Sequence, residues 1–442
     1  MVPLCAGAVL NPVNSTVIAT ALSPIGGDLG VGPSATAWLV AVMYLASAIG
    51  QPVAGRLADQ FGPRRVFLAG GMLVAVAGVL GALAPDFSWL LASRALVGLG
   101  TGAAFPAAIA MLREQAGRLG VPTPPRTLAL LSTVSLVTLT VGPPLGGVLV
   151  DTIGWRAVFA VNVPLGLAVT ALGFLLLPRS LPRHREARAW RLLDLPGTAL
   201  FGGAVSLFLL TTMKLPRPPA AVLLGLVGCL LLLVLVEVRV RTPFIDLRML
   251  GTNAALVTAY ARVFLTFLVV YGVLFGLTPW LQDSRGLSAS AAGLVLLGMS
   301  AVGAVAAFVG VRGRRLLPPL MVGALGLLAG SAGMLVLDAD SSIALLVLVC
   351  AAFGLPNGLG LVANQLLVYR AAPADHVGAA AGLFRTAQYT GAMTATGVAA
   401  LAYADGVSGD GLHFLGWVSV GAGALLLLLT VGDRGLRRFA EV

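Results

Sequence analysis

Three arginines stand inside apolar runs that are each long enough to cross a lipid bilayer: Arg94, Arg262 and Arg385. A charged side chain near the middle of a bilayer costs at least about 2.5–3.5 kcal/mol, so such a residue is a functional candidate by default. A long side chain can also extend to the interface and leave only its stem among the lipid tails. Arg94 and Arg262 lie deep within their runs, which favours transport or coupling roles for them. For Arg385, a functional role and extension of the side chain to the interface both stay open.

The acidic residues follow a different pattern, because none of the 17 Asp and Glu residues falls in the middle of an apolar run. Export of a cation in exchange for a proton requires a buried carboxylate. The sequence therefore predicts a cavity that is positive, or neutral where backbone carbonyls satisfy an arginine, and substrates that are neutral or anionic amphipathic molecules. Asp151 and Glu114 lie closest to the predicted bilayer and are the fallback proton sites.

Neutral polar residues in the apolar runs are candidates for the lining of a substrate cavity. Asn14 is assigned to coupling with the arginines. The predicted cavity residues are Thr16, Tyr260, Asn357, Asn364, Gln388 and Tyr389. The alternative is that these side chains only join neighbouring helices, through hydrogen bonds worth roughly 0.6 kcal/mol each. The sequence does not decide between the two interpretations.

A polar loop at residues 55–65 separates the second and third apolar runs. Gly55 permits close helix packing, and Gly62 permits a tight turn. Asp59 can pair with basic neighbours such as Arg64 and Arg65. We predict that this cluster is a conformational latch on the cytoplasmic side of the protein.

These residues require membrane-spanning helices to position them. The 442-residue chain is 58% hydrophobic and 10% charged, whereas soluble domains carry about 25% charged residues. Apolar runs of about 20 residues match the thickness of the bilayer core, and there they must be helical. We predict an all-α integral membrane protein with fourteen spans, near 3–24, 34–54, 66–84, 88–112, 127–149, 157–177, 195–213, 220–237, 254–281, 288–310, 317–337, 341–367, 378–402 and 412–431.

The basic residues predict the orientation of these spans. With the N-terminus in the cytoplasm, 21 of the 28 Lys and Arg residues fall in inside loops and four in outside loops. This asymmetry follows the positive-inside rule, so a net charge of +11 indicates orientation in a membrane and not binding to nucleic acid. We expect a multi-pass protein of a bacterial inner membrane with both termini in the cytoplasm. Residues 1–178 and 251–442 form two six-helix halves, and 179–250 hold basic linkers and an inserted helix pair.

Several motifs resemble those of the major facilitator superfamily. Residues 55–65 resemble its signature loop, residues 90–102 its buried-arginine motif around Arg94, and residues 14–24, 155–164 and 242–248 the motifs of its fourteen-helix drug:proton antiporter branch. Gly142, Pro143, Gly146 and Gly147 lie in a stretch similar to the antiporter motif. The resemblance implies a proton-coupled exporter of drugs or secondary metabolites that works by alternating access between its two halves.

The chain departs from the pattern of this branch at some positions. The branch usually has Asp where this chain has Asn14, and an earlier Gly of the antiporter motif is replaced by Thr138. The counterpart of the signature loop in the second half, residues 310–315, lacks an Asp. An uncoupled facilitator or a membrane sensor of the same fold therefore remains the alternative.

The sequence argues against an enzyme. It contains neither a G-x-x-x-x-G-K-[ST] nucleotide loop nor an H-E-x-x-H metal motif nor a G-x-S-x-G nucleophile elbow. The three cysteines, Cys5, Cys229 and Cys350, all lie within apolar runs, so we expect no metal site and no disulfide framework. We predict a monomer without cofactor or nucleotide, driven by a proton gradient.

Overall fold

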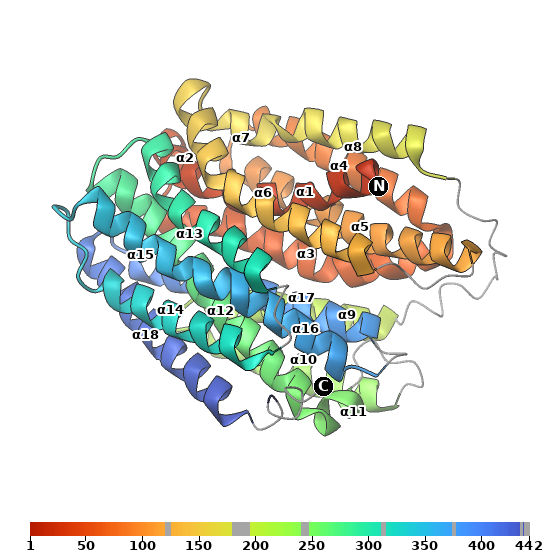
Figure 1. Ribbon diagram of the computed structural model, residues 1–442. Helices are drawn as coiled ribbons and strands as arrows, with labels where there is room; N and C mark the ends of the chain where they lie inside the picture. Colours follow the sequence, from red (N-terminus) through yellow and green to blue (C-terminus); the bar gives the residue numbers. More distant parts are fainter. Residues whose placement is uncertain are drawn as a thin grey trace.

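A computed structural model describes residues 1–119, 125–178, 195–239, 247–310, 315–373, 377–433 and 436. All regular secondary structure in these ranges is helical, and the long helices run side by side in one bundle (Figure 1).

The first part of the chain forms the N-terminal bundle, α1 to α8. Its helices are α1 (Val2–Thr16), the 3-10 segment η1 (Val17–Ala21), α2 (Leu22–Leu29), α3 (Pro33–Phe61), α4 (Pro63–Ala82), α5 (Phe87–Leu119), α6 (Pro125–Thr152), α7 (Arg156–Ala160) and α8 (Asn162–Leu176). α3, α4 and α6 each begin with a proline. The first amides of a helix have no intrahelical acceptor, so a proline there, which lacks an amide proton, costs no hydrogen bond. The break between α3 and α4 falls at Gly62. Its φ of 92° lies in a backbone region that residues with a side chain rarely adopt.

The last part forms the C-terminal bundle, α12 to α18. It contains α12 (Ala254–Pro279), the π-helical segment η3 (Trp280–Ser284), α13 (Ala289–Gly310), α14 (Leu317–Met334), α15 (Ile343–Leu355), the π-helical segment η4 (Pro356–Gly360), α16 (Leu361–Ala371), α17 (Val377–Ala402) and α18 (Gly409–Gly432). Pro356 has no amide hydrogen to donate to the preceding turn, which explains why the regular α-helix ends at Leu355.

Two helices, α9 (Leu195–Met213) and α10 (Ala220–Arg239), lie between these bundles in the sequence, followed by the short α11 (Leu247–Thr252). α9 packs against α3 of the N-terminal bundle and against α17 of the C-terminal bundle. α10 packs mainly on α9 and exposes a row of leucines, including Leu224 and Leu231. An exposed apolar face of this size suits a helix surrounded by lipid.

Twelve helices in the described ranges are long and apolar enough to cross a membrane. The expected count of fourteen is therefore not confirmed. The two expected spans outside the twelve correspond to α6 and α17, which are helices of 28 and 26 residues. Gly, Thr, Arg385 and Gln388 lower the mean hydropathy of α17. This helix packs against α3, α9 and α12.

The two bundles meet along two helix pairs, α6 with α13 and α3 with α17. We call the end of the bundle that holds residues 30–32, 83–86, 153–155 and 285–288 the distal end, and the opposite end the proximal end. At the distal end, the Ser23 hydroxyl donates to Asp283 at 3.1 Å, and the Gln282 amide donates to the Thr20 carbonyl at 3.0 Å. These contacts join the N-terminal and C-terminal bundles directly.

Candidate functional site

Three tyrosines from the two bundles meet deep inside the protein. Tyr44 lies on α3, Tyr271 on α12 and Tyr389 on α17, and all three side chains are buried. The ring of Tyr44 stands 5.5 Å from that of Tyr271, edge to face, and 5.7 Å from that of Tyr389. Because each tyrosine is a third or more of a helix length from either end, the cluster sits near mid-depth in the bundle.

The tyrosine cluster offers hydrogen-bonding groups as well as flat surfaces. The Gln51 side-chain amide of α3 donates to the hydroxyl of Tyr389. The hydroxyl of Tyr44 is buried and has no hydrogen-bond partner among the described residues. A buried polar group without a partner costs about 1–3 kcal/mol. A polar atom of a bound molecule can offset that cost, and the rings can stack on an aromatic group.

Two further predicted residues lie on α17 beside this cluster. Arg385 is half-buried and precedes Tyr389 by four residues, so the two side chains share one face of the helix. Gln388 is buried with 3% of its surface exposed. Tyr44, Tyr271 and Gln51 were not among the predicted site residues. Tyrosine counts as an apolar residue in a hydropathy pattern, which explains why two of them were missed.

Arg94 of α5 is fully enclosed in the N-terminal bundle, with 2% of its surface exposed. Its Nε donates to the Leu39 carbonyl at 2.9 Å, and its terminal nitrogen donates to the Asn14 carbonyl at 3.1 Å and to the Met43 sulfur at 2.8 Å. The arginine thus joins α5 to α3 and α1 through backbone oxygens. This arrangement agrees with the expectation of an arginine satisfied by carbonyls.

The Asn14 side chain does not contact Arg94, although its backbone does. Its amide nitrogen donates to the Leu10 carbonyl at 2.9 Å and to the side-chain oxygen of Asn162 at 2.6 Å. Both amide protons are therefore used inside the N-terminal bundle, where they join α1 to α8. Asn162 was part of a recognised motif, but its pairing with Asn14 could not be seen in the sequence because 148 residues separate them.

The glycines of α6 let this helix approach two different elements closely. A Cβ at Gly142 would collide with the Thr16 side chain, and one at Gly146 would lie 2.6 Å from the Thr20 hydroxyl. A Cβ at Gly147 would lie 2.6 Å from Cα of Ser290 on the other bundle. Thr16 itself donates to a carbonyl of its own helix. The motif thus presses α6 against η1 on one side and α13 on the other.

Pro143 takes part in the second of these contacts. Its carbonyl oxygen lies 2.5 Å from the position that a Cβ on Gly293 would occupy. α6 continues as one helix through Pro143 and Pro144 to Thr152. The two prolines therefore lie within a continuous helix that packs on α13.

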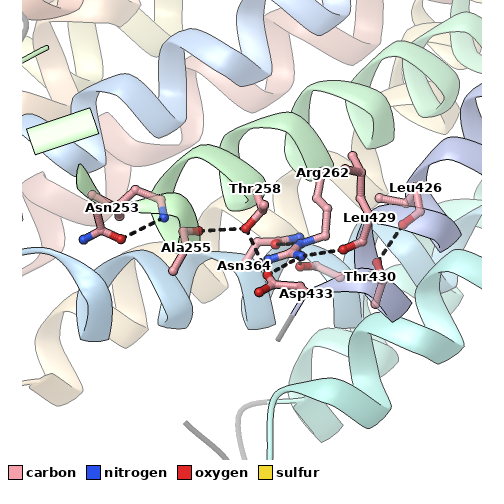
Figure 2. A network of polar contacts seen from close by, with 11 residues as sticks. Asn253, Ala255, Thr258, Arg262, Asn364, Leu426, Leu429, Thr430 and Asp433 are labelled. Atoms are coloured by element: carbon pink, nitrogen blue, oxygen red, sulfur yellow. Dashed lines mark hydrogen bonds and ion pairs between the residues drawn. The ribbon is translucent and has the colours of Figure 1, made fainter. Parts of the chain in front are cut away.

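Arg262 of α12 differs from Arg94 because a carboxylate neutralises it (Figure 2). Its side chain is fully buried and donates to Asp433 at 2.9 Å and to the Asn364 side-chain oxygen at 3.0 Å. Asp433 directly follows α18 and, like the other acids, lies outside the middle of the apolar runs. Its side chain nevertheless folds back against α12 and is 7% exposed.

The same network continues toward the proximal end of α12 (Figure 2). The Thr258 hydroxyl donates to Asp433 at 2.9 Å, and the Asn253 amide donates to the Ala371 carbonyl at 2.8 Å. Asn253 also caps α12 by accepting from the Leu256 amide. The network therefore joins α12, α16 and α18 within the C-terminal bundle.

The remaining predicted cavity residues join helices of the C-terminal bundle. The Tyr260 hydroxyl donates to the Ala380 carbonyl of α17 at 3.0 Å. Asn364 donates to the Gly360 carbonyl besides accepting from Arg262. Asn357 lies in η4, and its amide nitrogen lies 3.7 Å from the position that a Cβ on Gly303 would take. The hydrogen bonds of Tyr260 and Asn364 thus go to protein atoms.

The predicted latch loop turns toward its own bundle where its side chains are described. Arg64 donates to the Phe174 carbonyl at 2.7 Å and lies over the ring of the same residue. Arg65 is exposed, and Gly55 lies at ordinary contact distance from Pro106 of α5. The backbone of Asp59 belongs to α3, but its side chain lies outside the described residues.

The two fallback proton sites have different surroundings. Asp151 lies at the distal end of α6 and accepts hydrogen bonds from the amides of Ala289 and Ser290, at 3.2 and 2.8 Å. Glu114 is half-buried in the last two turns of α5, toward the proximal end. Among the described residues, no group of three or more His, Cys, Asp or Glu side chains is arranged to hold a metal ion.

Comparison with known proteins places this arrangement in a family. The chain is 30% identical to an uncharacterised transporter, YwoD, of Bacillus subtilis over 99% of this chain and 97% of that protein. It is 30% identical to the tetracenomycin C resistance and export protein of Streptomyces glaucescens, over 90% of this chain and 74% of that protein. It is 31% identical to the multidrug resistance protein Stp of Mycobacterium tuberculosis, over 84% and 69%.

A solved structure shares the fold. The inward-open conformation of the xylose transporter XylE from E. coli superposes with a TM-score of 0.63 at 15% identity, covering 96% of this chain and 94% of that one. A sequence profile of the Major Facilitator Superfamily matches residues 4–396. The chain therefore belongs to the major facilitator superfamily and is a multi-pass membrane transporter.

Proposed function

We propose that this transporter is a secondary active exporter of amphipathic small molecules, such as drugs or secondary metabolites, and that it is a proton antiporter. The observation that carries this proposal is the tyrosine cluster of Tyr44, Tyr271 and Tyr389. Its rings come from both bundles, so a molecule bound among them would contact the N-terminal and the C-terminal bundle at the same time. Relatives named for multidrug resistance and for tetracenomycin C export support efflux as the direction of transport.

Fourteen spans are part of the same proposal. Besides the twelve apolar helices, α6 and α17 would cross the membrane at the centre of the bundle, where each packs on the opposite bundle. The excess of arginine in the loops of the proximal end supports a cytoplasmic location for that end and for both termini. We assign the protein to the bacterial inner membrane as a monomer.

Transport would proceed by alternating access between residues 1–178 and 251–442, with 179–250 as linkers and the inserted helix pair. The contacts between bundles at the distal end support a conformation that is closed toward the outside. In the opposite conformation, the loop of residues 55–65 would hold the cytoplasmic side closed through Asp59 and its arginine neighbours.

The substrate would be neutral or anionic. Arg94 carries a positive charge whose described partners are uncharged oxygens and a sulfur. Arg262, in contrast, is neutralised by Asp433 and does not add to a positive cavity. Arg385, four residues before Tyr389 on α17, places a further positive charge on the face of the helix that carries this tyrosine. The proton gradient would drive transport without a cofactor or nucleotide. Asp151 and Glu114 are the candidate proton carriers.

The second candidate function is an uncoupled facilitator or a membrane sensor. The observation that favours it is the Asn14–Asn162 amide pair, which occupies a buried position without a group that titrates near neutral pH.

Everted vesicles test the proposal. The vesicles would be loaded with a pH-sensitive dye and energised to an acid interior, and cationic, neutral and anionic amphipaths would be added in turn. We expect proton release on neutral or anionic compounds. Release on cations alone would contradict the charge argument, and no release from vesicles that transport a compound would favour the uncoupled alternative. Vesicles with Tyr44→Ala serve as the matched comparison for the site.

A further inference from the structure

The distal ends of α6 and α13 are joined by a carboxylate from one bundle and the first turn of a helix from the other. The first amides of a helix have no intrahelical acceptor. Asp151, near the end of α6, accepts from the amides of Ala289 and Ser290, the first two residues of the 22-residue α13. A negative charge at this position also interacts favourably with the helix dipole. The α13 start therefore has a cap supplied by the opposite bundle.

The helices approach closely enough for this because small residues lie directly below the carboxylate. Gly147 is one turn before Asp151, and a Cβ there would lie 2.6 Å from Cα of Ser290. Gly293, one turn into α13, faces the Pro143 carbonyl in the same way. Side chains at either glycine would separate the helices and remove the amides from the reach of Asp151.

The other polar contacts described between the bundles at this end are single hydrogen bonds. The Gln282 amide donates to a backbone carbonyl, and the Ser34 hydroxyl donates to the Ala400 carbonyl at 3.0 Å. The Ser23 hydroxyl donates one bond to the carboxylate of Asp283 at 3.1 Å. Asp151 accepts bonds from two successive backbone amides, and hydrogen bonds with an ionised partner are roughly twice as strong as neutral ones.

We propose that Asp151 is a positioning residue that holds the outer side of the transporter closed by capping α13 across the bundle interface. This inference rests on the alternating-access part of the proposed function. When the bundles separate at the distal end, the first turn of α13 keeps only its local cap, the hydroxyl of Ser288, which accepts from the Ala291 amide.

The protonation state of Asp151 agrees with this role. Partial burial acts to raise the pKa of its carboxyl, and the hydrogen bonds from Ser290, Ser288 and Ala289 outweigh that effect and lower it below its usual value. The carboxylate is consequently ionised at neutral pH while the distal end is closed.

Distance measurements between spin labels test the proposal without substrate or proton gradient. One label would replace Ile153 of the N-terminal bundle and the other Ile343 of the C-terminal bundle, both exposed, after replacement of the native cysteines Cys5, Cys229 and Cys350 by alanine. For Asp151→Ala we expect the ratio of separated to closed distal ends to rise at least about tenfold, because two charge-assisted hydrogen bonds are lost.

Two variants sharpen the result. Asp151→Asn keeps a neutral cap and should give a smaller shift than Asp151→Ala. Asp28→Ala is the matched control, since this exposed acid bonds Arg156 and Trp155 within its own bundle and should leave the distances unchanged. Correct insertion of each variant would be verified by gel filtration.

Unchanged distances in Asp151→Ala, or an equal shift in Asp28→Ala, would overturn the proposal. If Asp151→Ala does not insert into the membrane, Gly147→Leu tests the same contact between α6 and α13. This variant should also increase the distance between the labels. Because the measurement needs no transport, it can fail while export is demonstrated, and it can succeed while proton coupling is disproved.

Discussion

Removal of the Asp433 carboxylate should destabilise the C-terminal bundle. In Asp433→Ala, the buried charge of Arg262 loses its ionised partner and keeps its bonds to Asn364 and to the Leu429 carbonyl. Breaking a buried ion pair by removal of one partner costs 3–5 kcal/mol. Since two bonds remain, we expect a loss at the lower end of this range, about 3 kcal/mol in the free energy of unfolding.

Reversible unfolding in mixed micelles would measure this loss. The double variant Arg262→Met with Asp433→Leu should recover most of it, because apolar replacement of a whole buried pair is often neutral or stabilising. The matched control is the exposed pair of Arg156 and Asp28, in which Asp28→Ala should cost less than about 1 kcal/mol. A loss below 1 kcal/mol in Asp433→Ala, or a double variant no more stable than the single one, would refute the reasoning.

Three other substitutions have defined outcomes. Arg94→Ala should abolish transport while the protein still inserts, because the carbonyls of α1 and α3 lose their shared donor; wild-type efflux per inserted molecule would contradict this. Gly62→Ala should lower the free energy of unfolding by about 1–3 kcal/mol, since φ is 92° there, whereas Gly27→Ala, in open space, should not. Asn14→Asp should change the pH dependence of efflux or permit cations, and unchanged efflux profiles would show that position 14 controls neither property.

The helices were predictable because apolar runs in lipid have few alternatives to helix. Lone arginines in such runs were equally visible, and both Arg94 and Arg262 are buried. Proline chemistry explains the end of the regular α-helix before Pro356. η1 had no such signal, because its residues Val17–Ala21 include neither proline nor glycine.

The partners of the buried polar groups were not predictable, because they come from distant parts of the chain. Asp433 lies 171 residues from Arg262, and a terminal acid near a helix end resembles any interfacial residue. Tyr44 and Tyr271 add to hydropathy and are therefore inconspicuous within a span. Only the packing of α17 against α3 and α12, with the ring contact between Tyr44 and Tyr271, reveals them as a cluster.

The central claim is proton-coupled export, and purified protein in liposomes with an imposed pH gradient tests it most directly. Neutral or anionic amphipaths should accumulate on the acidic side against their own concentration gradient, reverse when the gradient is reversed, and equilibrate when a protonophore is added. Equilibration at the same rate with and without the gradient would contradict the account and identify an uncoupled facilitator.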